Sequence, residues 1–183
     1  MRQLLILDLD ETLVSGQEER LERPPDVAVD RFFVYFRPHY KEFLEEMEKH
    51  FDIAIWTASS DGYALPIVKK LFEDLTPPVF VFTSERATTR YNSVDGNVKV
   101  VKRLKKVKVK FGYTLADILI VDDKKDTFQD NYGNGIEIKS FNGESNDEEL
   151  LYLKEYILNI KGQNYREVYK ENWRKETLLK NSF

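Results

Sequence analysis

The chain has 183 residues, 42% of them hydrophobic and 13% aromatic, which is enough apolar material for one substantial core, so we expect a single domain over residues 1–183. The lack of cysteine excludes disulfides, thiolate metal sites and cysteine nucleophiles, and the presence of only two histidines argues against a multi-histidine metal site. A formal net charge of −4 argues against general attraction to nucleic acid. Because aspartates interrupt the short apolar stretch at the N-terminus, we expect neither a signal peptide nor a membrane span, and we favour a cytoplasmic location.

The first predicted element is a buried strand that ends in acidic residues. The segment "LLILDLD" (residues 4–10) is a nearly continuous apolar run interrupted by Asp8 and Asp10. Such a run is typical of a parallel strand that is covered on both faces. Residues 16–30 are polar and contain two prolines, so we expect an exposed loop there, leading to a strand near residues 32–36.

Helical and strand-like patterns then alternate along the chain. Helical spacing is found in two sets of apolar residues: Tyr40, Phe43, Leu44 and Met47, and then Ala64, Ile67, Val68 and Leu71. Between these predicted helices, "FDIAIWTAS" (residues 51–59) has the composition of a second buried strand.

The second half of the chain continues the alternation. Residues 83–98 contain few apolar residues and an Asp95-Gly96 turn signal, which indicates an irregular insertion or a small hairpin. We predict further strands over residues 78–82, 117–123 and 135–141, and C-terminal helices within about 147–180, over residues 147–160 and about 163–180.

These elements indicate an α/β fold with a parallel sheet, whose ligands bind beyond the carboxyl ends of the strands. That edge of the sheet collects five polar side chains: Asp8, Asp10, Thr57, Asp122 and Asp123. Carboxylates this close together repel one another and require a counter-charge. A Mg²⁺ ion would supply this counter-charge, because it prefers oxygen ligands from one or two carboxylates and from phosphate.

Four segments carry a resemblance to a known family: "DLDETLV", "RPHYKEFLEEM", "IWTASSDGYA" and "ILIVDD". In this order and spacing they resemble the haloacid dehalogenase (HAD) superfamily and, more narrowly, the NLI-interacting-factor-like family, typified by the FCP/SCP C-terminal-domain phosphatases of RNA polymerase II. The similarity runs from about residue 3 to about residue 160. It implies a Rossmann-like parallel sheet flanked by helices, with at most a small loop or hairpin as a cap, and Mg²⁺-dependent hydrolysis of phosphomonoesters through an aspartyl-phosphate.

The resemblance also implies roles for individual residues. Asp8 would be the nucleophile, and Asp10, two residues further on the same side of an extended segment, would transfer protons. Thr57 and the backbone near Ala58 would bind the phosphoryl oxygens. The metal site would comprise Asp8, the main-chain carbonyl of Asp10 and the pair Asp122-Asp123, in which either residue could be the direct ligand.

The position of the expected catalytic lysine is less sharply defined by the sequence. In the family it follows two apolar or aromatic residues and opens a helix, so "VVKRL" indicates Lys102, with Lys99 as the alternative. Relatives usually have an acidic residue where this chain has Arg103. Arg37, in its Arg-Pro pair, is left as either a site residue or a surface residue, and Glu11 receives no catalytic role.

Residues 13–52 and 58–99 leave room only for loops or a small hairpin over the site, and an open cleft suits a bulky substrate. We therefore favour a phosphorylated protein or another bulky phosphomonoester as substrate. The alternative is the same chemistry on a small metabolite or a nucleic-acid end, because a fold does not determine its substrate. A non-enzymatic module that binds a phosphorylated ligand ranks last, since it would be expected to lack Asp8 or Asp10.

Overall fold

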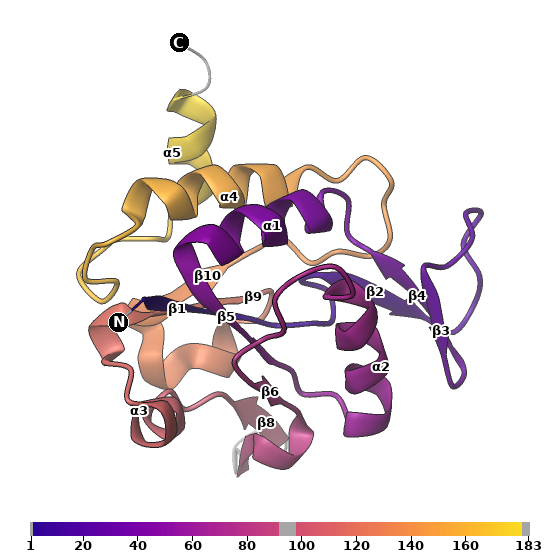
Figure 1. Cartoon of the computed structure of the whole chain (residues 1–183), viewed down its shortest axis with the longest axis horizontal. Helices are drawn as coiled ribbons and strands as arrows, with labels where there is room; N and C mark the ends of the chain where they lie inside the picture. Colours follow the sequence, from indigo (N-terminus) through magenta and orange to yellow (C-terminus); the bar gives the residue numbers. More distant parts are fainter. Residues whose placement is uncertain (1, 92–97, 181–183) are drawn as a thin grey trace.

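A five-stranded parallel sheet forms the centre of the chain. It is seen in a computed structural model that describes residues 2–91 and 98–180, and its strand order is β10-β9-β1-β5-β6 (Figure 1). The strands are β1 (Gln3–Leu7), β5 (Phe51–Trp56), β6 (Val81–Phe82), β9 (Ile118–Asp122) and β10 (Gly135–Glu137). The chain starts in the central strand, adds β5 and β6 on one side, and then adds β9 and β10 on the other. The predicted α/β class with a parallel sheet is confirmed, and the strand order reverses around β1.

Alternate side chains of β1 enter two separate cores. The helical segments that contribute to these cores or adjoin them are α1 (Tyr40–His50), α2 (Asp61–Leu71), α3 (Lys105–Phe111), η2 (Leu115–Asp117), η3 (Lys125–Asn134) and α4 (Glu149–Ile160). Leu5 and Leu7 pack with apolar side chains of α1, α2 and α4, whereas Leu4 and Ile6 pack with side chains of α3 and of η3. In Figure 1, α1 and α4 lie above the sheet and α3 lies below it. Burial on both faces explains why β1 lacks polar alternation.

A second, antiparallel sheet follows β1 and corrects one expectation. Residues 16–30 are not only a loop, because β2 (Val14–Gln17) and β3 (Val27–Val29) both pair with β4 (Phe32–Phe36). Strands of three or four residues are too short to show a period of two in the sequence, and their pairing depends on contacts with β4. This three-stranded sheet extends to one side of the molecule, beside α2 (Figure 1).

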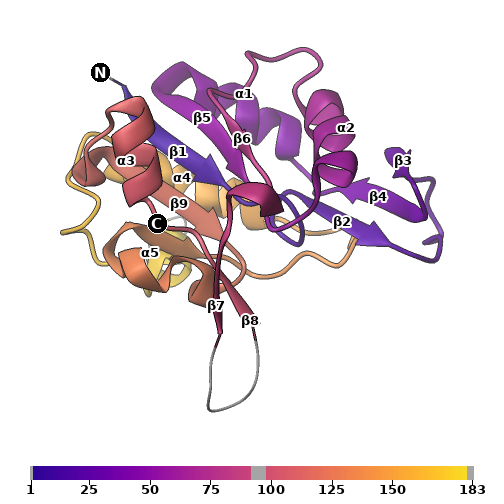
Figure 2. The ribbon, with the colours of Figure 1, turned by 90° about the horizontal axis from the view of Figure 1, so that it is seen from below.

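Residues 83–98 contain a short helical turn, η1 (Ser84–Arg86), and one arm of a hairpin. The hairpin is formed by β7 (Thr88–Tyr91) and β8 (Val98–Val101), which pair in an antiparallel manner. It projects away from the body of the molecule (Figure 2). The Asp95-Gly96 turn predicted for this hairpin lies outside the described residues.

Both predicted C-terminal helices are present, but the second one is shorter than predicted. Helix α4 covers most of the predicted 147–160, but the next helix, α5 (Trp173–Lys180), begins about ten residues later than predicted. Gly162, with a φ of 81°, ends the first helix, and the Lys170 ammonium then donates to backbone carbonyls, including that of Gly133 at 2.8 Å. These bonds hold residues 161–172 against η3 in an irregular path.

Two predicted strands are shorter than expected. The strand predicted over residues 78–82 is regular only at Val81–Phe82, although the Val79 N–H also donates to the Ile53 carbonyl of β5 at 2.8 Å. The strand predicted over 135–141 ends at Glu137. Prolines that precede the first of these strands cannot donate to a ladder. Over the described ranges, the helices are all too short or too polar to cross a lipid bilayer.

Candidate active site

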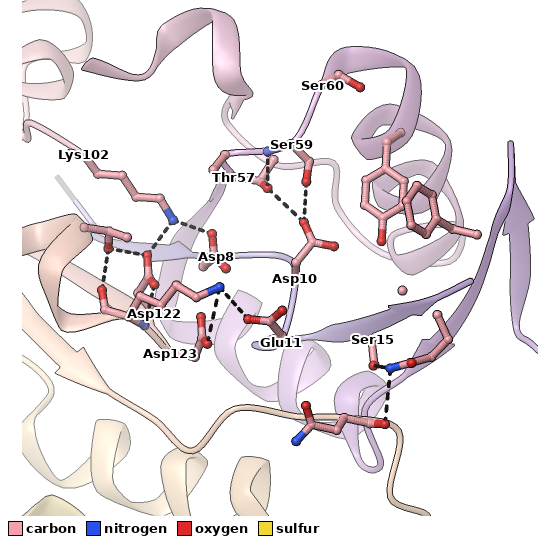
Figure 3. Close-up of a pocket in the computed structure, with 18 residues that line it drawn as sticks. Asp8, Asp10, Glu11, Ser15, Thr57, Ser59, Ser60, Lys102, Asp122 and Asp123 are labelled. Atoms are coloured by element: carbon pink, nitrogen blue, oxygen red, sulfur yellow. Dashed lines mark hydrogen bonds and ion pairs between the residues drawn. The ribbon is translucent and has the colours of Figure 1, made fainter. Parts of the chain in front are cut away.

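The polar residues predicted at the strand ends meet at one edge of the parallel sheet. The Asp8 N–H donates to the Val121 carbonyl at 2.9 Å, and the Thr57 N–H donates to the Phe82 carbonyl at 2.8 Å, so both residues continue their strands. They lie in a pocket of about 460 Å³ (Figure 3). All seven site residues inferred from the sequence line this pocket: Asp8, Asp10, Thr57, Ala58, Lys102, Asp122 and Asp123.

A buried lysine bridges two of the carboxylates. The Lys102 ammonium donates to Asp8 and, at 2.6 Å, to Asp122 (Figure 3). Its side chain is only 1% exposed, and burial alone would lower the pKa of Lys102, but the charges of Asp8 and Asp122 outweigh that effect and raise it. Lys102 therefore remains a cation that orients and neutralises its two partners.

Neighbouring segments place this lysine. Lys102 follows β8 directly, its N–H donates to the Thr127 carbonyl at 2.6 Å, and its carbonyl accepts from the Asn131 side chain at 3.1 Å. The alternative from the sequence, Lys99, pairs with Asp126 at 2.6 Å outside this pocket. The tertiary structure thus brings Lys102, and not Lys99, to the carboxylates.

Three carboxylates form an acidic cluster with room for a cation. Oxygens of Asp8, Asp122 and Asp123 lie within 4.8 Å of one another, and all three residues are buried. Burial, offset in part by Lys102 and reinforced by Asp122, raises the pKa of Asp8 to about 8. Burial also raises the pKa of Asp123, whose carboxylate accepts from the Ser140 hydroxyl at 2.8 Å. One ammonium does not keep three buried carboxylates ionised, since a pKa of about 8 leaves Asp8 largely protonated at neutral pH without a further cation. A hard divalent cation would favour the ionised form of Asp8, and this oxygen donor set fits Mg²⁺.

The two aspartates of the segment "ILIVDD", Asp122 and Asp123, differ in the number of hydrogen bonds that their carboxylates accept. Asp122 accepts from Lys102, from the Thr127 hydroxyl at 2.6 Å and from the Lys124 N–H at 2.8 Å. Asp123 accepts the hydroxyl of Ser140 on one oxygen. The Asp123 carboxylate thus retains the greater capacity for a ligand.

The carboxylate of Asp10 points away from the acidic cluster (Figure 3). One of its oxygens accepts from the Ser59 hydroxyl at 2.6 Å and from the Thr57 hydroxyl at 3.3 Å. The side chain is therefore not part of the cluster, which leaves the main-chain carbonyl as the atom of Asp10 for the implied metal contact. Sequence reasoning missed Ser59, although its position two residues after Thr57 was a usable signal.

The sequence analysis also missed an ion pair between Lys124 and Glu11, which both line the pocket. The Lys124 ammonium donates to Glu11 at 2.6 Å and lies 4.0 Å from an Asp123 oxygen. The Glu11 backbone is in the left-handed region, with a φ of 59°, where the chain turns sharply after Asp10. In the sequence, this contact was signalled only by the two consecutive lysines that follow "ILIVDD".

The opposite wall of the pocket comes from the antiparallel sheet and α2. Phe32 and Tyr63 line it and pack edge to face, with ring centroids 5.4 Å apart. Burial and the neighbouring Asp10 charge raise the pKa of Tyr63, so its hydroxyl stays protonated. The pocket thus has one charged wall and one aromatic wall.

Comparison with known proteins finds similarity to phosphatases over most of the chain. The family model described as NLI interacting factor-like phosphatase matches residues 3–168. The chain is 34% identical over 161 residues to CTD small phosphatase-like protein 2 of Dictyostelium discoideum, covering 84% of this chain and 26% of that protein. It is 29% identical over 167 residues to CTD nuclear envelope phosphatase 1 of Xenopus tropicalis, covering 83% of this chain and 64% of that one.

Among solved structures, the fission yeast RNA polymerase II CTD phosphatase Fcp1 matches with a TM-score of 0.55 and 17% identity, over 99% of this chain and 56% of that one. At 17% identity, this similarity shows a shared fold and nothing beyond it. The chain spans between 26% and 64% of the length of the two curated relatives named above.

Proposed function

The chain belongs to the NLI interacting factor-like phosphatase family, and from this premise we propose that it hydrolyses phosphomonoesters by a Mg²⁺-dependent mechanism with an aspartyl-phosphate intermediate. The observation that carries the proposal is the pairing of Asp8 with Lys102 in a pocket that also holds Asp10. A carboxylate that is oriented by a buried ammonium, with a second carboxylate lining the same pocket, can act as a nucleophile served by an acid and base.

In the first step, an Asp8 oxygen attacks phosphorus, and the bond from phosphorus to the leaving oxygen breaks. Asp10, in its protonated form, donates a proton to that leaving oxygen. In the second step Asp10 takes a proton from water, whose oxygen attacks phosphorus and releases Asp8 and inorganic phosphate. The Ser59 hydroxyl, which donates to the Asp10 carboxylate at 2.6 Å, holds that carboxylate in position for both transfers.

Lys102 and the segment at Thr57 and Ala58 prepare the site for this chemistry. Lys102 favours the ionised form of Asp8 and keeps its oxygen aimed into the pocket. Thr57 and the backbone at Ala58, which also line the pocket, would bind the phosphoryl oxygens. Asp122 acts mainly through Lys102, because the bonds described above already occupy its oxygens.

Asp8, Asp123 and the main-chain carbonyl of Asp10 would hold the magnesium ion. When bound, the ion supplies positive charge that offsets repulsion between the nucleophile and the phosphate. The proposal is supported by the proximity of the acidic side chains and by the excess of carboxylates over ammonium groups around Lys102.

We further propose a phosphorylated protein as the substrate class. The pocket is bordered by small insertions, and several relatives are named as CTD phosphatases. Hydrolysis of a small metabolite or of a phosphorylated nucleic-acid end is the competing possibility, and it uses the same catalytic residues.

Replacing the nucleophile tests the mechanism. Asp8→Asn should lower the rate of phosphate release from para-nitrophenyl phosphate by at least about 10³-fold, because the amide cannot form the phosphoenzyme. A chelator should abolish the activity of the unaltered chain, and added Mg²⁺ should restore it. Asp74→Asn, at an exposed carboxylate paired with Lys41, is the matched control and should keep full activity. Chelator-resistant turnover, or an active Asp8→Asn variant, would rule the mechanism out.

A further inference from the structure

A groove of about 550 Å³ lies between η1 and α3, and none of the residues that line it lines the catalytic pocket. Five cationic side chains line it: Arg86, Arg103, Lys105, Lys106 and Lys110. One carboxylate, that of Glu85, also lines it, together with Val109, whose side chain is largely exposed. The groove is therefore strongly basic on a chain whose net charge is −4.

Most of this positive charge is not neutralised within the fold. Arg103 pairs with Asp130 at 3.2 Å, and the Lys106 ammonium donates to the Arg86 backbone carbonyl at 2.7 Å, which ties the two walls together. Within residues 2–91 and 98–180, no carboxylate pairs with the side chains of Arg86, Lys105 or Lys110. A surface with several unpaired cations attracts an anionic partner.

The groove adjoins the catalytic pocket through both of its walls. Arg103 directly follows Lys102, which contacts the nucleophile. On the other wall, the Ser84 N–H donates to the carbonyl of Ser59, whose hydroxyl holds Asp10, at 2.9 Å. A chain bound in the groove can therefore continue toward the catalytic pocket.

We propose that this groove binds an acidic segment of the phosphoprotein substrate that flanks the phosphorylated residue, an inference that rests on the proposed function. The groove is short, because α3 has seven residues and so rises about 10 Å along its axis. That length accommodates about three residues of an extended peptide. Exposed Val109 offers an apolar contact to an aliphatic side chain of the same segment.

Nucleic acid fits this groove less well than a peptide. Proteins that bind single strands stack bases on exposed aromatic rings, and the ring lining this groove, Phe82, is 5% exposed. Lys110 already lies over that ring, 5.4 Å from its centroid. The net negative charge of the chain also disfavours a long polyanion that extends past the groove.

Binding can be measured without turnover by using the Asp8→Asn chain and fluorescence anisotropy. The probes are two labelled phosphoserine peptides, one flanked by glutamates and the other by glutamines. The glutamate peptide should bind about tenfold more tightly, and this advantage should fall with added salt. Lys105→Glu combined with Lys110→Glu should remove most of the advantage, whereas Lys69→Glu combined with Lys70→Glu, at exposed positions of α2, should leave it unchanged.

Equal binding of the two peptides, or an advantage that survives the charge reversal on α3, would overturn the assignment. Tighter binding of a single-stranded oligonucleotide or of phosphatidylserine vesicles to the same groove would overturn the choice of a peptide. Hydrolysis of para-nitrophenyl phosphate by the unaltered chain separates the two proposals. If hydrolysis is present and the glutamate advantage is absent, only the groove assignment fails, whereas absent hydrolysis with a glutamate advantage counts against the function alone.

Discussion

Arg37 shows how a single residue behind the site supports it. Its guanidinium is completely buried and donates to Asp147 at 2.7 and 2.9 Å, and to the backbone carbonyls of Thr12 and Lys139. The side chain therefore joins the turn after β1 to the segment that supplies the Ser140 hydroxyl to the acidic cluster. The structure corrects both sequence alternatives for Arg37, because it neither lines the catalytic pocket nor lies on the surface.

This buried pair should make stability depend on pH in a defined direction. Burial alone would raise the pKa of Asp147, but the Arg37 guanidinium outweighs it and holds that pKa below its ordinary value of 3.8. The pair therefore contributes full stability above pH 3.8, and the contribution is lost as the pH falls through the lower pKa of the folded chain.

Asp147→Asn should cost about 3–5 kcal/mol in the free energy of unfolding at pH 7, because it leaves a buried cation without a counter-charge. The cost should shrink as the pH is lowered from 4 toward 2.5, since the unaltered Asp147 is then protonated too. Urea denaturation across this range measures the difference. Asp74→Asn, at an exposed position, is the control and should leave the free energy of unfolding nearly unchanged throughout. A cost for Asp147→Asn that does not vary with pH would contradict the assignment.

At the scale of elements, η3 folds back closely over β10. Gly135 begins β10 opposite Ile120 of β9, and a Cβ placed on it would overlap the buried ring of Phe128. The backbone of Gly135 has an ordinary φ of −94°, so the requirement for glycine here is one of space. This contact allows η3 to cover the sheet while also placing Thr127 and Asn131 against Lys102.

Gly135→Ala should therefore destabilise the chain by about 1–3 kcal/mol, because the added methyl group forces the Phe128 ring to move. Gly62→Ala is the matched substitution at a helical position with open space around it. It should stabilise the chain by up to about 1 kcal/mol, since alanine has the higher helix propensity. Urea denaturation midpoints would show shifts of opposite sign, and shifts of equal sign would contradict the packing argument.

At the scale of the whole molecule, the insertions leave the carboxyl edge of the sheet accessible. The antiparallel sheet forms one wall of the pocket, and the hairpin of β7 and β8 projects outward (Figure 2). Site residues come from strand ends and loops on both sides of β1, so the pocket lies where the strand order reverses. An accessible pocket of this kind can receive a residue that remains part of a large polymer.

The value of kcat/KM for a phosphopeptide should therefore exceed that for a sugar phosphate by at least about tenfold, equivalent to about 1.4 kcal/mol in transition-state binding. Contacts outside the phosphate, available only to the larger substrate, supply the difference. Phosphate release assays with both substrates and with a phosphorylated oligonucleotide end measure the ratio. A preference for the sugar phosphate or for the oligonucleotide would favour the competing substrate class.

The sequence by itself determined the central sheet and most of the site. The apolar runs of β1, β5 and β9 indicate strands that are buried on both faces of the sheet, and Asp8, Thr57 and Asp122 lie at the ends of these strands. Because carboxyl ends of parallel strands share an edge, local patterns sufficed to bring these residues together.

The contacts between distant segments became visible in the folded chain alone. The fold selected Lys102 over Lys99, paired the short strands β2 and β3 with β4, and turned the Asp10 carboxylate toward Ser59. Such features depend on which long side chain reaches a buried charge, or on which backbone lies beside a short strand. They leave no periodic trace in the sequence, because hydrophobic periodicity reports which face of an element is buried and not which partner lies against it.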